Sequence, residues 1–169
     1  MTPTVVLVGP PGAGKSTVAR RLGNALNLAV IDTDELIARE HGKPCGEVFA
    51  ELGEAGFREV EARHVAAALE HPGVLSLGGG AITHPGTRLL LREHVVVWVD
   101  VSAKEGLRRT QAEGTRPVLE AADPAARYRA LLEQREPWYR EVSTHRVRTD
   151  GRTPAQVVSL ILAILDVEQ

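Results

Sequence analysis

The sequence contains little that would direct the chain to a membrane, to nucleic acid or to an oxidising compartment. Among its 169 residues there is one cysteine, Cys45, so no internal disulfide can form, which is typical of proteins in a reducing cytoplasm. The formal net charge of −2 argues against general binding to nucleic acid or to an anionic membrane. No apolar run is long enough to span a bilayer, and residues 1–3 carry no basic leader. We therefore expect one cytoplasmic domain, residues 1–169, with no nucleic-acid or membrane partner and with Cys45 in a structural role.

Motifs of two signalling classes are also missing. Asn24 and Asn27 are the only asparagines, so the chain has no N-K-x-D motif for reading guanine, which argues against a GTPase switch. The H-R-D and D-F-G motifs of protein kinases are absent as well. The six histidines are scattered along the chain without the spacing of a metal site.

The most informative segment is GPPGAGKST, residues 9–17, which matches the phosphate-loop pattern G-x-x-x-x-G-K-[ST] and follows an apolar run, Val5–Val8. Glycines let backbone N–H groups approach phosphate oxygens, and the start of the following helix adds free donors. We expect Lys15 to reach the β- and γ-phosphates of a nucleotide and Ser16 to ligate Mg²⁺. The residues expected to bind the nucleotide here are Gly12, Ala13, Gly14, Lys15, Ser16 and Thr17.

Strand-like and helical segments alternate along the whole chain, which predicts an α/β fold with a five-stranded parallel sheet flanked by helices, the three-layer architecture of P-loop proteins. Residues 113–123 show no clear hydrophobic periodicity, and the segment has the length that is usual for a lid loop. Pro137 falls late in the helix that begins at Pro124, and we expect it to kink or end that helix. The strands are predicted near residues 4–8, 28–31, 74–77, 95–99 and 145–148, and the long helical stretch after residue 34 is expected to break near Gly42–Pro44 and Gly53.

Carboxylates follow two of these strands and are candidates for the metal site. Asp32 and Asp34 stand two residues apart at the end of the second strand, so one could serve Mg²⁺ while the other faces a phosphate acceptor. Asp100 ends another strand, but it precedes Ser102 at the start of a helix and could simply help to cap it. We therefore prefer Asp32 for the metal, and we note that Asp34 could also favour the dipole of its own helix.

Glycines and arginines complete the predicted site. Gly78–Gly80 implies a close backbone approach, either to a ligand or within a tight bend. Arg116 lies in the centre of the lid, where a guanidinium could neutralise charge on a transferring phosphoryl group. Arg58 and Glu61 are three residues apart on one helix, so they form either a surface pair or a pair that orients Arg58 toward a carboxylate.

The combination of motifs resembles the shikimate kinases, and the resemblance runs nearly end to end. Any P-loop kinase could share the phosphate loop, whereas the other motifs, taken together, are much more specific to this one family. They are DTD (32–34), FREVE (57–61), SLGGG (76–80), TRP (115–117) and QREPWY (134–139). The resemblance implies transfer of phosphate from ATP to the 3-hydroxyl of shikimate with Mg²⁺, a step toward chorismate and the aromatic amino acids.

The resemblance also implies a role for each site residue, within a substrate-binding region at about residues 33–61 and a lid at about residues 111–123. Asp34 would hydrogen-bond the ring hydroxyls and is the candidate base. Arg58 and Arg135 would hold the carboxylate, with Glu61 orienting Arg58. The other implied roles are ring contacts for Gly78, Gly79, Gly80, Phe49 and Phe57, phosphoryl stabilisation for Lys15 and Arg116, Mg²⁺ binding for Ser16 directly and for Asp32 through water, and an adenine platform for Arg109, Arg152 and Pro154.

Two other functions fit parts of the pattern. A kinase for another small hydroxylated acid, such as gluconate, would share the phosphate loop and the size of the chain. A nucleotide-dependent binding module would use the loop only to drive a conformational switch, although such a switch needs no polar pocket of this kind. Nothing in the sequence requires a second copy of the chain, so we expect a monomer.

Overall fold

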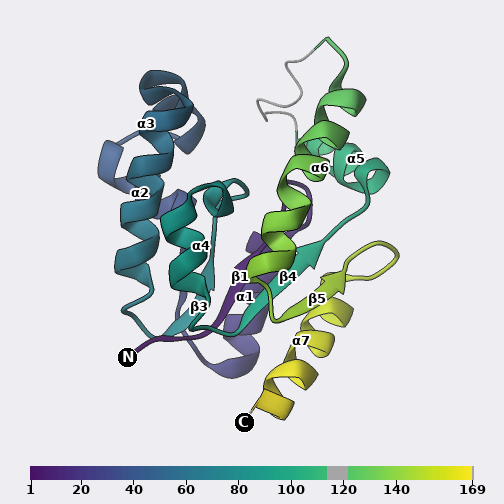
Figure 1. Ribbon diagram of the computed structural model, residues 1–169. Coiled ribbons are helices and arrows are strands. Elements are labelled where there is room, and N and C mark those ends of the chain that lie inside the picture. The colour runs from purple at the N-terminus through teal and green to yellow at the C-terminus, as the bar shows by residue number, and fades with distance from the viewer. Residues whose placement is uncertain (114–121, 169) are drawn as a thin grey trace.

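The computed structural model describes residues 1–113 and 122–168 (Figure 1). Residues 114–121, which include Arg116 and most of the predicted lid, lie outside the described residues. No helix in the described ranges has the length and apolar character needed to cross a membrane. The elements are β1 Pro3–Val8, α1 Lys15–Leu26, β2 Val30–Asp32, α2 Thr33–His41, α3 Cys45–Ala68, β3 Gly73–Ser76, the 3-10 helix η1 Ala81–Thr83, α4 Pro85–Leu91, β4 Val96–Asp100, α5 Ala103–Glu113, α6 Pro124–Val142, β5 His145–Arg148 and α7 Pro154–Glu168.

The five strands form one sheet in the order β2-β3-β1-β4-β5, and every neighbouring pair is parallel. The α/β fold class predicted from the sequence is therefore confirmed. β1 lies at the centre, so the loop that follows it emerges at the middle of the carboxyl edge of the sheet, where ligands gather in such folds. β2 and β3 end beside it, at Asp32 and Ser76.

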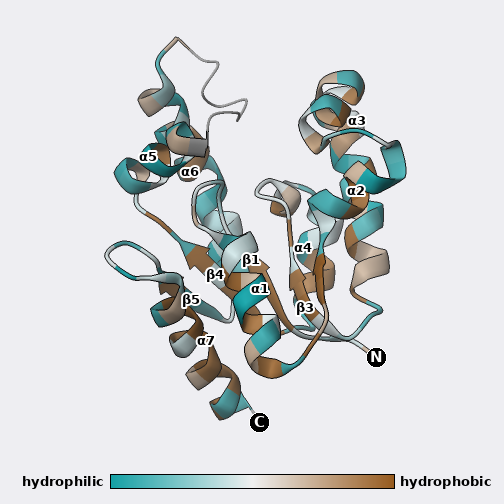
Figure 2. Cartoon of the chain, turned by 180° about the vertical axis from the view of Figure 1, so that it is seen from behind, coloured by the Kyte–Doolittle hydropathy of each residue, from teal (hydrophilic) through white to brown (hydrophobic). Residues whose placement is uncertain are grey.

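Helices cover both faces of the sheet. On one face α1 and α7 pack against side chains such as Leu7 and Val99, and on the other α3, α4 and α6 pack against Val6, Leu75 and Trp98. In Figure 2 the strands β1, β3 and β4 are mostly brown, as expected for strands buried on both faces. A smaller apolar cluster joins α2 to α3 and makes a separate helical unit beside the sheet (Figure 1).

Local geometry explains where the prediction was right and where it was wrong. The predicted break at Gly53 is confirmed, because its φ of 73° and ψ of 171° are not helical. β2 begins at Val30 rather than at Leu28, since the N–H of Leu28 still bonds the Gly23 carbonyl at the end of α1. Of the two effects expected of Pro137, ending the helix is wrong, because α6 continues to Val142.

The last turn of α6 survives the proline because tertiary packing holds it. Tyr139 and Val142, both beyond Pro137, are buried in the cluster that covers the sheet. That burial offsets the hydrogen bond that a proline removes from a helix interior.

Candidate active site

The phosphate loop has the geometry of an anion site. Gly14, the N-cap residue of α1, is in the left-handed region with φ of 88° and has no side chain that could cap the first turn. The backbone N–H groups of that turn therefore remain available to an anion. Lys15 Nζ donates to the carbonyl oxygens of Gly9, at 2.6 Å, and of Pro10, at 3.3 Å, which places the ammonium inside the curve of the loop.

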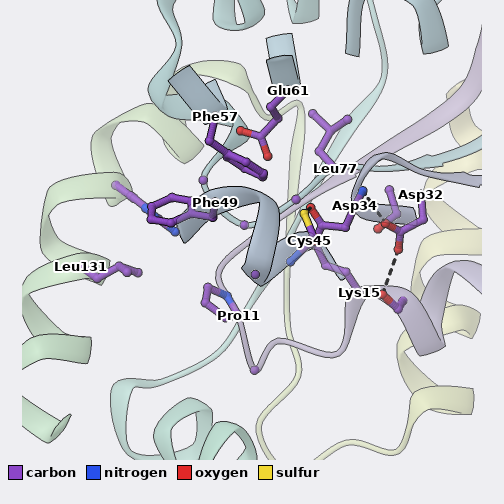
Figure 3. Close-up of a pocket in the computed structure, with 18 of the residues that line it drawn as sticks. Pro11, Lys15, Asp32, Asp34, Cys45, Phe49, Phe57, Glu61, Leu77 and Leu131 are labelled. Atoms are coloured by element: carbon purple, nitrogen blue, oxygen red, sulfur yellow. Dashed lines mark hydrogen bonds between the residues drawn. The ribbon is translucent and has the colours of Figure 1, made fainter. Parts of the chain in front are cut away.

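Ser16 and Asp32 meet beside the loop. The Ser16 hydroxyl donates to Asp32 Oδ2 at 3.1 Å, and Oδ1 of the same carboxylate accepts from the N–H of Asp34 at 2.9 Å, which caps α2 (Figure 3). A hydroxyl and a carboxylate so placed suit a hard divalent cation. In residues 1–113 and 122–168 no three His, Cys, Asp or Glu side chains gather as a metal site. A cation here would therefore draw its other ligands from phosphates and water.

Asp100, the second metal candidate in the sequence, is directed elsewhere. Its Oδ2 accepts from Arg146 Nη2 at 2.7 Å and from Arg148 Nε at 2.9 Å, both on β5. The carboxylate is buried and lines a small separate cavity rather than the one at the phosphate loop. Its observed contacts thus tie β4 to β5.

A cavity of about 700 Å³ joins the phosphate loop to the predicted acceptor site. Its wall is formed by the loop, α2, α3, the segment 76–80 and α6. Figure 3 shows Phe49, Phe57, Glu61 and Asp34 arranged around it. Ala13 is buried and does not line the cavity. The sequence-predicted residues that do line it are Gly12, Gly14, Lys15, Ser16, Thr17, Asp32, Asp34, Phe49, Phe57, Arg58, Glu61, Gly78, Gly79, Gly80 and Arg135.

Cys45 also lines this cavity, next to Asp34 (Figure 3). Its Sγ lies 3.6 Å from Asp34 Oδ1, within reach of a weak S–H hydrogen bond. Burial, together with the charge of Asp34, raises the pKa of the thiol to about 12. Cys45 therefore stays neutral beside the Asp34 carboxylate. The structural role expected for Cys45 from the sequence did not include this contact.

Arg58 is held at the floor of the cavity by two carboxylates. Its Nη1 donates to Glu61 Oε1 at 2.8 Å, and its Nε donates to Glu54 Oε1 at 3.1 Å. The guanidinium carbon also lies 5.7 and 5.4 Å from the ring centres of Phe49 and Phe57. Burial raises the pKa of the Glu61 carboxyl above its usual range, and Arg58 opposes that rise. The predicted pair is thus a buried one that fixes the direction of Arg58.

Arg135, on α6, is nine-tenths buried. Its Nε is buried without a hydrogen-bond partner among the described residues. The side chain also lines the cavity, and a carboxylate is the ligand that best matches a guanidinium fork. Arg135 therefore fits an acidic ligand in the cavity.

The triple glycine is required by close contacts rather than by its backbone. A Cβ on Gly78 would lie 2.5 Å from Asp34 Oδ1, and one on Gly80 would lie 2.2 Å from Arg58 Nη2. None of the three glycines has a positive φ. The segment 78–80 is therefore pressed against the polar side chains of the cavity, with no room for a side chain of its own.

Comparison with known proteins assigns the family. The family model described as shikimate kinase matches residues 11–166. The chain belongs to the shikimate kinase family. A shikimate kinase of Corynebacterium efficiens is 65% identical over 97% of both chains. The shikimate kinase of Acinetobacter baumannii, solved in complex with shikimate, has 33% identity and a TM-score of 0.93 over 100% of this chain and 95% of that one.

A gluconokinase of Sinorhizobium meliloti shares the fold alone. It is 22% identical, with a TM-score of 0.61 over 96% of this chain and 90% of that one. The likeness explains why the phosphate loop and the size of the chain could not separate the two kinds of kinase.

The structure places the three residues of the expected adenine platform around one turn. Arg109 Nη1 donates to Thr149 Oγ1 at 2.9 Å and to the Gly12 carbonyl at 3.3 Å, so it ties that turn to the phosphate loop. Arg152 is exposed, and its guanidinium bonds the Arg148 carbonyl. Pro154 opens α7. Of the three, only Arg109 contacts the phosphate loop through an observed hydrogen bond.

Sequence reasoning missed three residues whose side chains bond the backbone of segments that line the cavity. The Thr33 hydroxyl oxygen, Oγ1, accepts a hydrogen bond from the Gly78 N–H at 3.0 Å. Tyr128 and Tyr139 bond carbonyls of the phosphate loop and of the glycine segment. The only available signals were the position of Thr33 between two aspartates and that of Tyr139 at the end of QREPWY.

Proposed function

We propose that the chain transfers the γ-phosphoryl group of ATP to the 3-hydroxyl of shikimate, giving shikimate 3-phosphate and ADP. This reaction is a step in the pathway to chorismate and the aromatic amino acids. One observation carries the proposal: a single cavity joins the phosphate loop to a polar pocket that contains Asp34, Arg58 and Arg135. The family of the chain and its 65% identity to a shikimate kinase support the same reaction.

The two arginines suit the carboxylate of shikimate. Arg58 is oriented by Glu61 and Glu54, and Arg135 lines the same cavity. Charge-assisted bonds from two guanidinium groups would fix the acid end of the ring in a site that excludes water. The backbone of Gly78–Gly80 and the rings of Phe49 and Phe57 would then flank the rest of the molecule.

Asp34 would receive the hydroxyl that becomes phosphorylated. Its carboxylate lies at the junction of the pocket and the phosphate loop, where an acceptor oxygen must approach the phosphoryl group (Figure 3). A carboxylate there can orient the hydroxyl and accept its proton as the new P–O bond forms. A loose phosphoryl-transfer transition state needs little base strength, so orientation is the larger part of this role.

Lys15 and Ser16 would hold the phosphates from the side of the loop. The donor set fits Mg²⁺, which Ser16 would bind directly and Asp32 through water, and the ion when bound would neutralise charge on the β- and γ-phosphates. Arg116, outside the described residues, stays the predicted stabiliser of the transferring group. Arg109 would contact the adenine, together with Arg152 and Pro154.

We propose further that the chain is one domain that acts as a monomer in the cytoplasm, with residues 33–61 binding shikimate and residues 111–123 closing as a lid. A lid is needed because water would otherwise compete as the phosphoryl acceptor. Molecular mass in solution, measured with and without substrates, tests the oligomeric part of this statement.

The direct test of function is ADP release from MgATP with shikimate, with gluconate and without acceptor. We expect release that depends on shikimate and is lost in Lys15→Ala and Asp34→Asn. Release with gluconate alone would support the assigned nucleotide site but show that shikimate is not the acceptor. A slow rate that no acceptor changes would favour the switch module instead.

A further inference from the structure

Helix α6 places two tyrosines and Arg135 on one face. Tyr128, Arg135 and Tyr139 are seven and four residues apart, which is the spacing of a helical stripe. The side chains of both tyrosines are buried. Arg135, which lies between the two tyrosines in this stripe, lines the cavity that joins the phosphate loop to the acceptor pocket. The stripe therefore lies beside the nucleotide half and the acceptor half of the site.

Tyr139 contacts the acceptor half. Its hydroxyl donates to the Gly79 carbonyl at 2.6 Å. The other two glycines are held from different elements, Gly78 by Thr33 on α2 and Gly80 by Thr83 in η1. Tyr139 thus supplies the bond between the middle of the glycine segment and α6.

Tyr128 makes the equivalent bond to the nucleotide half. Its hydroxyl donates to the carbonyl of Pro11 in the phosphate loop. The two tethered loops also touch, since a Cβ on Gly79 would lie 2.9 Å from Pro11 Cδ. One helix therefore holds two adjacent loops through two hydroxyl groups.

We propose that Tyr139 is a positioning residue for the acceptor and Tyr128 its counterpart for the nucleotide. Tyr139 fixes the Gly79 peptide, and with it the backbone against which the shikimate ring is bound. Tyr128 fixes the Pro11 peptide and the loop that cradles the phosphates. The assignment of each half to a substrate rests on the proposed function.

The surroundings of Tyr139 suit this role. Burial raises the pKa of its hydroxyl to about 12, so the group stays protonated and can donate at every working pH. The ring stacks on Trp98, with 5.6 Å between centres and 24° between planes. Tyr139→Phe keeps that packing and removes only the donor, and Tyr128→Phe makes the same chemical change on the same helix.

The two variants serve as controls for each other in steady-state kinetics. Losing one neutral hydrogen bond should weaken binding about two- to tenfold. We expect Tyr139→Phe to raise KM for shikimate by about that factor with KM for ATP within about twofold, and Tyr128→Phe to do the reverse. Loss of general stability would not produce this crossed pattern. Equal changes in both KM values, in either variant, would overturn the proposal.

Hydrogen exchange tests the tethers without substrate. In Tyr139→Phe, amides of residues 78–81 should exchange at least several-fold faster than in the parent, while those of residues 12–14 keep their rates, and Tyr128→Phe should show the opposite. Unchanged exchange at residues 78–81 in Tyr139→Phe would refute the tether. If the parent released no ADP with shikimate, the proposed function would be wrong. The exchange rates would still show whether Tyr139 and Tyr128 hold the two loops.

Discussion

Adding one methyl group at Gly80 should damage acceptor binding through Arg58. The φ of Gly80 is −101°, so alanine is allowed by the backbone. Its Cβ, however, would lie 2.2 Å from Arg58 Nη2 and 2.5 Å from Cζ. Ordinary contact begins near 3.4 Å, so the guanidinium must move by more than 1 Å (3.4 − 2.2 = 1.2). Because the moving group is the end of a flexible side chain, the fold should tolerate the change.

The cost should appear in catalysis. A displacement of this size breaks the alignment of Arg58 with Glu61 and with the carboxylate of the acceptor, and 1 Å of misplacement can cost about 10²-fold. We expect kcat/KM for shikimate to fall about 10²-fold in Gly80→Ala, with KM for ATP within about twofold. Initial rates measured at varied concentrations of each substrate give both numbers.

Gly56→Ala is the matched control for this prediction. Gly56 lies in the same helix as Arg58, and its added Cβ would meet only Leu52 Cβ at 3.4 Å, an ordinary contact. Alanine is favoured over glycine inside a helix, so this variant should keep its activity and its stability. Parent-like kinetics in Gly80→Ala, or an equal loss in Gly56→Ala, would refute the argument from the Arg58 contact.

Three further predictions concern side chains of the cavity. Asp34→Asn should lower kcat by about 10²-fold or more, the range expected for a lost acid–base group, and should leave ADP affinity nearly unchanged by calorimetry; equal turnover would remove Asp34 from the reaction. Arg135→Ala should weaken shikimate binding by about 2–5 kcal/mol, and native affinity in a titration would contradict the carboxylate clamp. Burial and the charge of Asp34 raise the pKa of Cys45 to about 12, so at pH 8 it should hold far less thiolate than an ordinary cysteine. Iodoacetamide should thus modify it very slowly until Asp34→Asn or unfolding lowers the pKa, and modification at the rate of the denatured chain would refute this.

Features fixed by neighbouring residues could be predicted from the sequence. The phosphate loop follows from glycine spacing between a strand and a helix. The Arg58–Glu61 pair follows from its helical spacing of three residues. At the start of α7, Thr153 and Gln156 form a capping box in which each side chain accepts the other's backbone N–H, and a Thr and a Gln three residues apart are typical of this motif.

Features fixed by distant residues could not be predicted in this way. The bond from Tyr128 to Pro11 spans 117 positions, and the bond from Tyr139 to Gly79 spans 60. Periodicity marks both tyrosines only as buried. The helix that continues past Pro137 likewise depends on a sheet that the local pattern does not contain. The end of the second strand indicated Asp34, and the resemblance to a family supplied Arg135, but neither gave the contacts that hold these side chains.

If the cavity binds shikimate as proposed, phosphate should go only to its 3-hydroxyl. Proton and phosphorus NMR of the product formed from shikimate and MgATP decides this, because the coupling between phosphorus and one ring proton identifies the phosphorylated carbon. We predict a single product, shikimate 3-phosphate, formed together with one ADP. Phosphate on another hydroxyl, or ADP formed without a phosphorylated acid, would overturn the assignment of the acceptor site.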